Sequence, residues 1–181
     1  MRRNVPRGAI PVMVVGRAAV LYAMPNPHTL RVFTLAEALN EQTHALLPAL
    51  PRRGAPGLSK QISRCISSIP ANIAEGAAKA SQADYARMLR IALGSANEAT
   101  THLRLASTLN GAPTLEFQHA RAQVTLIASM LTKLIASIER DLARKEDEKR
   151  NRAIRAKRHQ RSATASDTTQ RPAPIADHHN R

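Results

Sequence analysis

Four stretches of this chain carry apolar residues at intervals of three and four, and prolines and glycines separate them. In the last stretch the intervals are 3, 4, 3, 4 and 4, along Val124, Ile127, Leu131, Leu134, Ile138 and Leu142. This spacing places all six side chains on one face of an α-helix. Four such helices with short connections can bury their apolar faces only against one another. We therefore predict an all-α fold, an antiparallel up-down four-helix bundle.

The other three stretches repeat the pattern. The first begins at Leu30 and ends at the run Pro48–Gly57, which holds three prolines and two glycines. The third begins at Ser81, where Asp84 three residues on forms a weak capping box, and ends at Asn110–Pro113. The expected inward-facing residues of the three stretches are Val32, Leu35, Leu39, Thr43 and Leu46; Leu58, Ile62, Cys65, Ile69 and Ile73; and Tyr85, Met88 or Leu89, Ala92, Ala96, Ala99 and Leu103.

Composition agrees with closely packed helices and excludes some other classes. Hydrophobic residues make up 43% of the chain, but only two phenylalanines and two tyrosines are present, and no strand-like alternation is seen. The single cysteine, Cys65, excludes an internal disulfide framework and a multi-cysteine zinc site. A reduced, cytoplasmic setting is the default expectation.

The net charge of +14 divides unevenly along the chain. Residues 1–28 hold four arginines and no acidic residue, residues 29–143 hold 12 basic and 8 acidic residues, and residues 144–181 hold 11 basic and 5 acidic residues. We expect a disordered or spurious extension over 1–28, since Pro11, Gly16 and Arg17 interrupt its apolar run and argue against a secretory signal. The bundle would occupy 29–143. A basic helical extension and a disordered tail would occupy 144–181.

The basic flank is the clearest functional signal. Seven basic residues and no acidic residue lie between positions 149 and 161, namely Lys149, Arg150, Arg152, Arg155, Lys157, Arg158 and Arg161. On a helix they point in all directions, which argues against a membrane-surface helix and favours phosphate contacts. The segment has no aromatic residue, so we expect sequence-independent binding. On the bundle, a second basic patch or merely a solvated face is formed by Lys60, Arg64, Arg87 and Arg90.

The run SSIPANIAEG, residues 67–76, is unusual for a helix interior. Pro70 deprives the Ile66 carbonyl of its partner, so we expect a kink there, with hydroxyls of Ser67 and Ser68 near the disturbed backbone. Gly76 would allow another helix to approach closely. The run LGSANE, residues 93–98, resembles it, because Gly94 and Ser95 are small and Glu98 again supplies a carboxylate.

Two interpretations of Glu75 and Glu98 are open. A catalytic carboxylate pair would serve acid–base or metal chemistry, but di-metal bundles add a Glu-x-x-His motif, which neither glutamate has. In the structural interpretation, which we favour, each glutamate accepts from a buried partner such as Asn72, a serine or an arginine.

No other enzyme signature is present. The chain has no Gly-rich phosphate loop, Cys65 falls on an apolar stripe as buried filler, and the seven histidines do not show metal-ligand spacing. We predict a non-enzyme without cofactor or metal.

The stretch from Gly57 to Leu103 resembles the signature of the bacterial four helix bundle protein family, also called the 23S ribosomal RNA intervening-sequence proteins. The matching segments are L-x-x-Q at 58–61, S-I-P-x-N-I-A-E-G at 68–76 and A-L-G-S-x-x-E at 92–98. The likeness spans about residues 30–143. The chain departs from the family in having Ala77 after Gly76 and only Phe33 as an early aromatic residue.

The resemblance implies a homo-oligomeric bundle, with a pentameric barrel as the expected assembly, and no enzymatic activity. It also implies kinship with the accessory variability determinant of diversity-generating retroelements, a basic pentamer that binds nucleic acid and a reverse transcriptase. Residues of the family motif would then serve packing and assembly; they are Ser68, Pro70, Asn72, Glu75, Gly76, Gly94, Ser95 and Glu98.

Two functional hypotheses follow. The first is an oligomeric, non-enzymatic bundle that binds DNA or RNA through phosphates, as an accessory subunit of a reverse transcriptase or another nucleic-acid enzyme. The second is a protein-interaction scaffold whose basic tails are only solvated. Neither requires a membrane.

Overall fold

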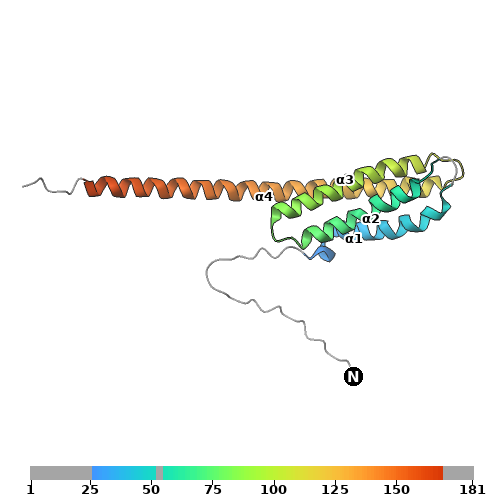
Figure 1. Cartoon of the computed structure of the whole chain (residues 1–181), viewed down its shortest axis with the longest axis horizontal. Coiled ribbons are helices and arrows are strands. Elements are labelled where there is room, and N and C mark those ends of the chain that lie inside the picture. The colour runs from blue at the N-terminus through green and yellow to red at the C-terminus, as the bar shows by residue number, and fades with distance from the viewer. Residues whose placement is uncertain (1–25, 52–54, 169–181) are drawn as a thin grey trace, which may run out of the picture.

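A computed structural model describes residues 26–51 and 55–168, with side chains to residue 160. Its helices are α1 (Arg31–Leu46), α2 (Leu58–Ala77), α3 (Gln82–Ala106) and α4 (Thr114–Thr168). Two short 3-10 helices, η1 (Pro27–Thr29) and η2 (Leu47–Ala49), flank α1. The described residues contain no strand (Figure 1). The predicted all-α four-helix fold is therefore confirmed.

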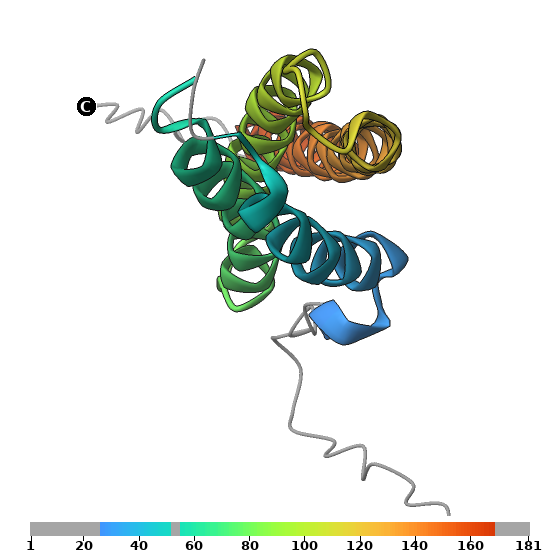
Figure 2. The ribbon, with the colours of Figure 1, turned by 90° about the vertical axis from the view of Figure 1, so that its right-hand side faces the viewer.

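Consecutive helices pack against each other in antiparallel pairs. Contacts between α2 and α3 and between α3 and α4 are the most extensive, and α1 packs more sparsely against α2 and α4. Ser68 of α2 meets Ser95 of α3, whereas Arg64, earlier in α2, meets Glu98, later in α3. Figure 2, which looks along the bundle, shows the four helices side by side.

Local sequence explains where the helices begin. The Ser81 Oγ accepts from the Asp84 backbone N–H at 3.0 Å and donates to the Asp84 carboxylate at 2.6 Å, so the expected cap of α3 is present. Gly57 and Gly111 precede α2 and α4 with φ of 81° and 79°, a left-handed conformation that glycine adopts without steric cost. α2 continues through Pro70 as one helix.

The core follows the predicted stripes closely. Every expected inward residue of α2 and α3 is buried. In α1 and α4 four expected residues, Leu35, Leu46, Leu134 and Leu142, are only partly buried. The interior gains residues that the stripes did not include, among them Phe33, Ala36, Ile66, Phe117 and Ile135. All but Phe117 lie within one turn of a predicted position, because a buried helical face is wider than a single line of residues. Phe117 lies two turns before Val124, so the inward face of α4 begins earlier than predicted.

α4 continues far beyond the bundle. Residues 146–160 are fully solvent-facing, and the helix extends away from its three partners in Figure 1. The portion from 146 to 168 is roughly 34 Å long at the α-helical rise. The predicted helical extension is thus present, while the domain boundaries remain predictions. The expectations for residues 1–25 and for the tail after 168 lie outside the described residues.

The bundle portion of α4 is apolar along much of its length. An 18-residue stretch within Thr114–Gln160 reaches a mean hydropathy of 1.2, enough by length and composition to cross a membrane, and 28% of it is buried. This is weak evidence for a membrane, because core helices of soluble bundles pass the same test. That the protein has no membrane partner stays a prediction.

Candidate functional site

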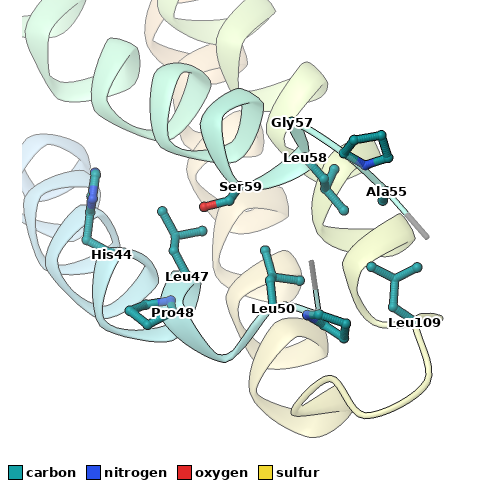
Figure 3. Close-up of a pocket in the computed structure, with 11 residues that line it drawn as sticks. His44, Leu47, Pro48, Leu50, Ala55, Gly57, Leu58, Ser59 and Leu109 are labelled. Atoms are coloured by element: carbon teal, nitrogen blue, oxygen red, sulfur yellow. The ribbon is translucent and has the colours of Figure 1, made fainter. Parts of the chain in front are cut away.

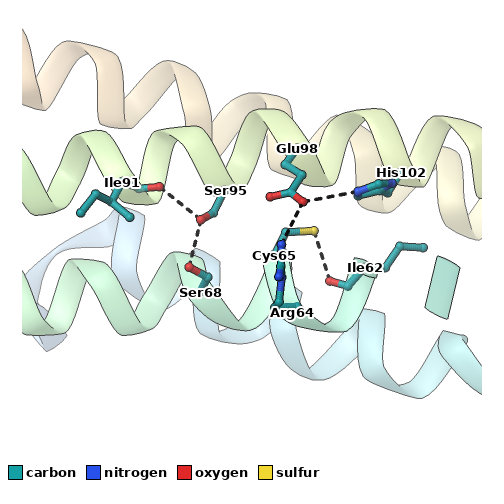
Figure 4. Close-up of polar contacts among 8 residues, drawn as sticks. All are labelled: Ile62, Arg64, Cys65, Ser68, Ile91, Ser95, Glu98 and His102. Carbon is teal, nitrogen blue, oxygen red and sulfur yellow. Dashed lines mark hydrogen bonds and ion pairs between the residues drawn. The ribbon is translucent and has the colours of Figure 1, made fainter. Parts of the chain in front are cut away.

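A polar seam, formed by Ser68, Asn72 and Ser95, joins α2 to α3 (Figure 4 draws its two serines). Asn72 Nδ2 donates to the Ser68 carbonyl at 2.7 Å and to Ser68 Oγ at 2.9 Å, and the two serine hydroxyls lie 2.9 Å apart. Ser95 Oγ donates its single proton to the Ile91 carbonyl at 3.2 Å, so Ser68 must donate to Ser95. These three residues of the family motif therefore form one directional chain of hydrogen bonds that holds two helices together.

Ser67 makes the equivalent connection to α1. Its Oγ donates to Asn40 Oδ1 at 2.9 Å, and His44 Nε2 lies 3.1 Å from the same Oγ. Since the serine proton goes to Asn40, His44 is the donor toward Ser67 and cannot act there as its base. A serine, a histidine and an asparagine are thus adjacent, but their arrangement is structural. The hydroxyls of Ser67 and Ser68 bond to side chains of neighbouring helices, Asn40 of α1 and Ser95 of α3. The expectation that the Ser67 hydroxyl lies with the backbone disturbed by Pro70 is therefore wrong.

The two motif glycines have opposite surroundings. A Cβ on Gly76 would lie 2.9 Å from Met88 Cβ and 2.9 Å from Tyr85 Cδ2, so the predicted close approach of another helix is confirmed. A Cβ on Gly94 would meet nothing within 4 Å, and Gly94 is exposed. The prediction of a close contact there is wrong, because Ala92 and Ala96 face the core and a residue midway between them points outward.

The two motif glutamates are exposed and far apart. Glu75 accepts from Lys79 Nζ at 2.8 Å, and this hydrogen bond, with the positive charges of Lys79 and Arg87, lowers the pKa of the carboxyl. Glu98 lies 3.6 Å from Arg64 and 3.6 Å from His102 (Figure 4). Glu98 has an arginine partner as expected, whereas Glu75 pairs with Lys79, and the expected burial is wrong for both, with 56% of the Glu75 side chain and 42% of the Glu98 side chain exposed.

A catalytic glutamate pair is absent from this arrangement. Arg64, the α2 neighbour of Glu98, precedes Glu75 by 11 residues, which is roughly 16 Å along the helix. Carboxylates so separated cannot share a proton or a metal ion. Within the described residues, no three His, Cys, Asp or Glu side chains are grouped to hold a metal.

Cys65 is a core residue. It is 2% exposed, and its thiol donates to the Ile62 carbonyl at 3.4 Å. Burial, with a smaller effect from the charge of Glu98, raises the pKa of the thiol to about 11. The predicted role as buried filler is confirmed, since a thiol with so high a pKa is a poor nucleophile at neutral pH.

A cavity lies beside the connection between α1 and α2 (Figure 3). Its volume is about 600 Å³, and its walls come from the α1–α2 connection and Leu109. Leucine and proline predominate, and His44 is the one histidine among the lining residues. Such a lining offers no pair of groups for acid–base catalysis.

The basic residues of the bundle do not form one patch. Arg64 pairs with Glu98, and Arg90 forms an ion pair with Glu139 of α4. Arg87 lies near Glu75 at the end of the bundle where α4 leaves it, while Lys60 lies at the opposite end of α2. Two of the four predicted contacts thus form ion pairs with carboxylates, and phosphate binding by these four residues stays a prediction.

The basic residues of the extension are brought together on one helix. Lys149, Arg150, Arg152, Arg155, Lys157 and Arg158 are all exposed on α4. Arg161 lies in the same helix, and its side chain is outside the described residues. Sequence reasoning missed the connections from Asn40 and His44 to Ser67 and from Gln82 to Lys145, the latter at 3.0 Å. The spacing of residues along a single helix does not predict such pairs, because each pair joins residues that are distant in sequence.

Comparison with known protein families assigns the bundle to one of them. The family model described as "23S rRNA-intervening sequence protein" matches residues 28–133. The chain belongs to the 23S rRNA-intervening sequence protein family. The match covers α1, α2, α3 and the first 20 residues of α4, and it ends before the basic extension. Both the family and its approximate span agree with the resemblance found in the sequence.

A solved structure supports the same placement of this intervening-sequence protein. A protein of unknown function from the S23 ribosomal protein family of Bacteroides thetaiotaomicron is 28% identical, with a TM-score of 0.53. The likeness covers 57% of this chain and 97% of that one. No curated protein matches. The basic extension of α4 lies outside the residues that the family model matches.

Proposed function

We propose that this intervening-sequence protein is a non-enzymatic, oligomeric bundle that binds nucleic acid through phosphate contacts made by the α4 extension. The observation that carries the proposal is the row of six exposed cations between 149 and 158, uninterrupted by an acidic residue. Each phosphate that such a row neutralises releases counterions, which adds salt-dependent and sequence-independent affinity. The family description, which refers to ribosomal RNA, agrees with a nucleic-acid partner.

Self-association is the second part of the proposal, and the surface that supports it lies between α1 and α4. This groove is lined by Leu35, Ala38, Leu39, Gln42, Gln123, Leu126 and Ile127. Leu126 is 51% exposed, and only 28% of the apolar stretch of α4 is buried within one chain. A second copy of the chain would cover this surface, and the family resemblance makes a pentamer the assembly to test. An oligomer would also present several basic helices to one nucleic acid.

A reverse transcriptase is the enzyme partner that the resemblance suggests, and the cytoplasm is the compartment that the proposal requires. The role that we propose is that of an accessory subunit, which contributes nucleic-acid binding to the enzyme. Co-purification of the two proteins, with and without nuclease treatment, separates direct binding from bridging by nucleic acid.

The first experiment measures binding to an unrelated DNA duplex and an unrelated RNA duplex over a salt series. We expect log affinity to fall with log salt with a slope of about −4 or steeper for the full chain. A chain ending at residue 148 retains the whole bundle and the Gln82–Lys145 contact, and its slope should approach zero. A slope near zero for the full chain contradicts the proposal and favours the alternative, a protein-interaction scaffold with solvated basic tails.

A further inference from the structure

The cations of the extension are distributed around the whole circumference of the helix, and this distribution indicates how the helix can contact a ligand. At 100° per residue, the six positions from Lys149 to Arg158 leave no gap wider than about 80° around the helix axis. They span about 14 Å along that axis. All six side chains are exposed, and no acidic residue lies between 149 and 160. The segment is thus a positively charged rod without a neutral side.

A flat or convex phosphate surface would use only one side of such a rod. The cations on the opposite side would remain in solvent and contribute little, because exposed charges farther away than a Debye length are screened. A groove with phosphates along both walls would engage the whole circumference. The all-round distribution therefore fits insertion between two phosphate rows.

The dimensions distinguish the two kinds of duplex. An α-helix with its side chains is about 10–12 Å across, and the major groove of B-form DNA is about 12 Å wide and admits one helix. The major groove of A-form RNA is deep and narrow and excludes such an element. The extension can also enter unobstructed, since every residue from 146 to 158 is exposed.

We infer that residues 149–158 of α4 bind in the major groove of duplex DNA, with cations on both sides of the helix contacting the two phosphate walls. This inference rests on the proposed nucleic-acid function and deepens it by naming B-form DNA as the ligand. The segment lies outside residues 28–133, which the family model matches, so the inference rests on the extension itself and not on the family match.

Two matched triple variants test the groove geometry. K149Q/R150Q/K157Q removes the cations on one side of the helix, within about 100° of each other, and R152Q/R155Q/R158Q removes those on the other side. Both variants lose the same charge, and glutamine keeps helix propensity close to that of lysine and arginine. Groove binding predicts that each variant loses a similar part of the affinity and about half of the salt slope. If one variant binds like the unchanged chain and the other loses nearly all affinity, the helix binds by one face and the inference is wrong.

A comparison of duplexes completes the test. Full-length protein is titrated with DNA and RNA duplexes of the same length and sequence, and DNA should bind about tenfold more tightly or better. Protection of guanine N7 from dimethyl sulfate reports occupancy of the major groove directly. Steep but equal binding to both duplexes, or tighter binding to RNA, overturns the inference and leaves the proposed function intact. Absence of salt-dependent binding to either duplex overturns both.

Discussion

At the scale of single residues, small side chains and local polar groups explain the family motif better than catalysis does. The sequence indicated that Gly76 meets another helix, since it follows an inward-facing run on α2, and the structure agrees. The sequence did not show that Gly94 differs from Gly76, because a glycine beside small residues can face either the core or the solvent. The outward direction becomes evident only when Ala92 and Ala96 are seen to fill the core.

The two glycines provide a matched pair of substitutions. Gly76→Ala should lower the free energy of unfolding by about 1–3 kcal/mol, because the added methyl overlaps Met88 Cβ and the Tyr85 ring. Gly94→Ala should raise it by up to about 1 kcal/mol, because alanine favours an exposed helix and nothing obstructs it. Chemical denaturation measures both. A loss of stability at Gly94 would show that something outside the described chain approaches it closely.

Cys65 makes a pH-dependent prediction. Its pKa is about 11 in the folded chain against 9.0 for a free thiol. Between these values the unfolded thiol loses its proton while the folded one retains it, so the free energy of unfolding contributed by this group falls as pH rises from about 9 to 11.

Thiol labelling checks the same property, and the single cysteine makes the readout unambiguous. At pH 8 a thiol reagent should react slowly with the native protein and rapidly in denaturant. A Cys65→Ala chain provides the blank, and its stability should decline less over the alkaline range. Rapid labelling of the native chain would contradict the buried position.

At the scale of elements, periodicity predicted the helices well and their contacts poorly. Every residue that the intervals along α2 and α3 placed inward is buried, although the intervals omitted other buried residues such as Ile66 and Ala86. The contacts between α1 and α4 are sparser than those between α2 and α3. Leu35 and Leu134, which lie on the predicted inward faces of α1 and α4, therefore remain partly exposed. Hydrogen bonds such as Ser67 to Asn40 depend on how the helices meet, which no single-helix pattern contains.

The cap of α3 is an element-scale feature that can be tested alone. Ser81→Ala removes both hydrogen bonds between Ser81 and Asp84 and should lower the free energy of unfolding by about 1 kcal/mol. Ser129→Ala, at an exposed position inside α4, is the control and should change it by less than about 0.5 kcal/mol. Equal effects of the two changes would mean that the cap does not stabilise α3.

At the scale of the whole molecule, the distribution of charge along the sequence predicted a mildly basic bundle followed by a strongly basic extension. In the structure one continuous helix, α4, joins these two parts. The bundle holds the residues that the family model matches, and the extension holds a run of exposed cations from 149 to 158 without an acidic residue. Assembly is the property that the sequence could predict only through family resemblance, because an apolar residue on a stripe can face either its own core or a second copy.

A charge placed on the groove between α1 and α4 tests assembly. Leu126→Glu should weaken self-association about tenfold or more and shift the mass in solution toward the 19.7 kDa of one chain, because a carboxylate would be buried between copies. Leu105→Glu, at a side chain 47% exposed on α3, is the control and should leave the mass unchanged. Light scattering measures both. If Leu126→Glu leaves an oligomer intact, the copies meet on another surface.

The continuity of α4 links the orientation of the bundle to that of whatever the extension binds. One residue inserted among 146–148 would turn the basic segment by about 100° and advance it by about 1.5 Å relative to the bundle. Because cations surround the axis, affinity should change little, while the bundle would swing around its ligand. The length of α4 therefore fixes the direction in which the bundle points around its ligand. The affinity of the basic segment for that ligand does not depend on this direction.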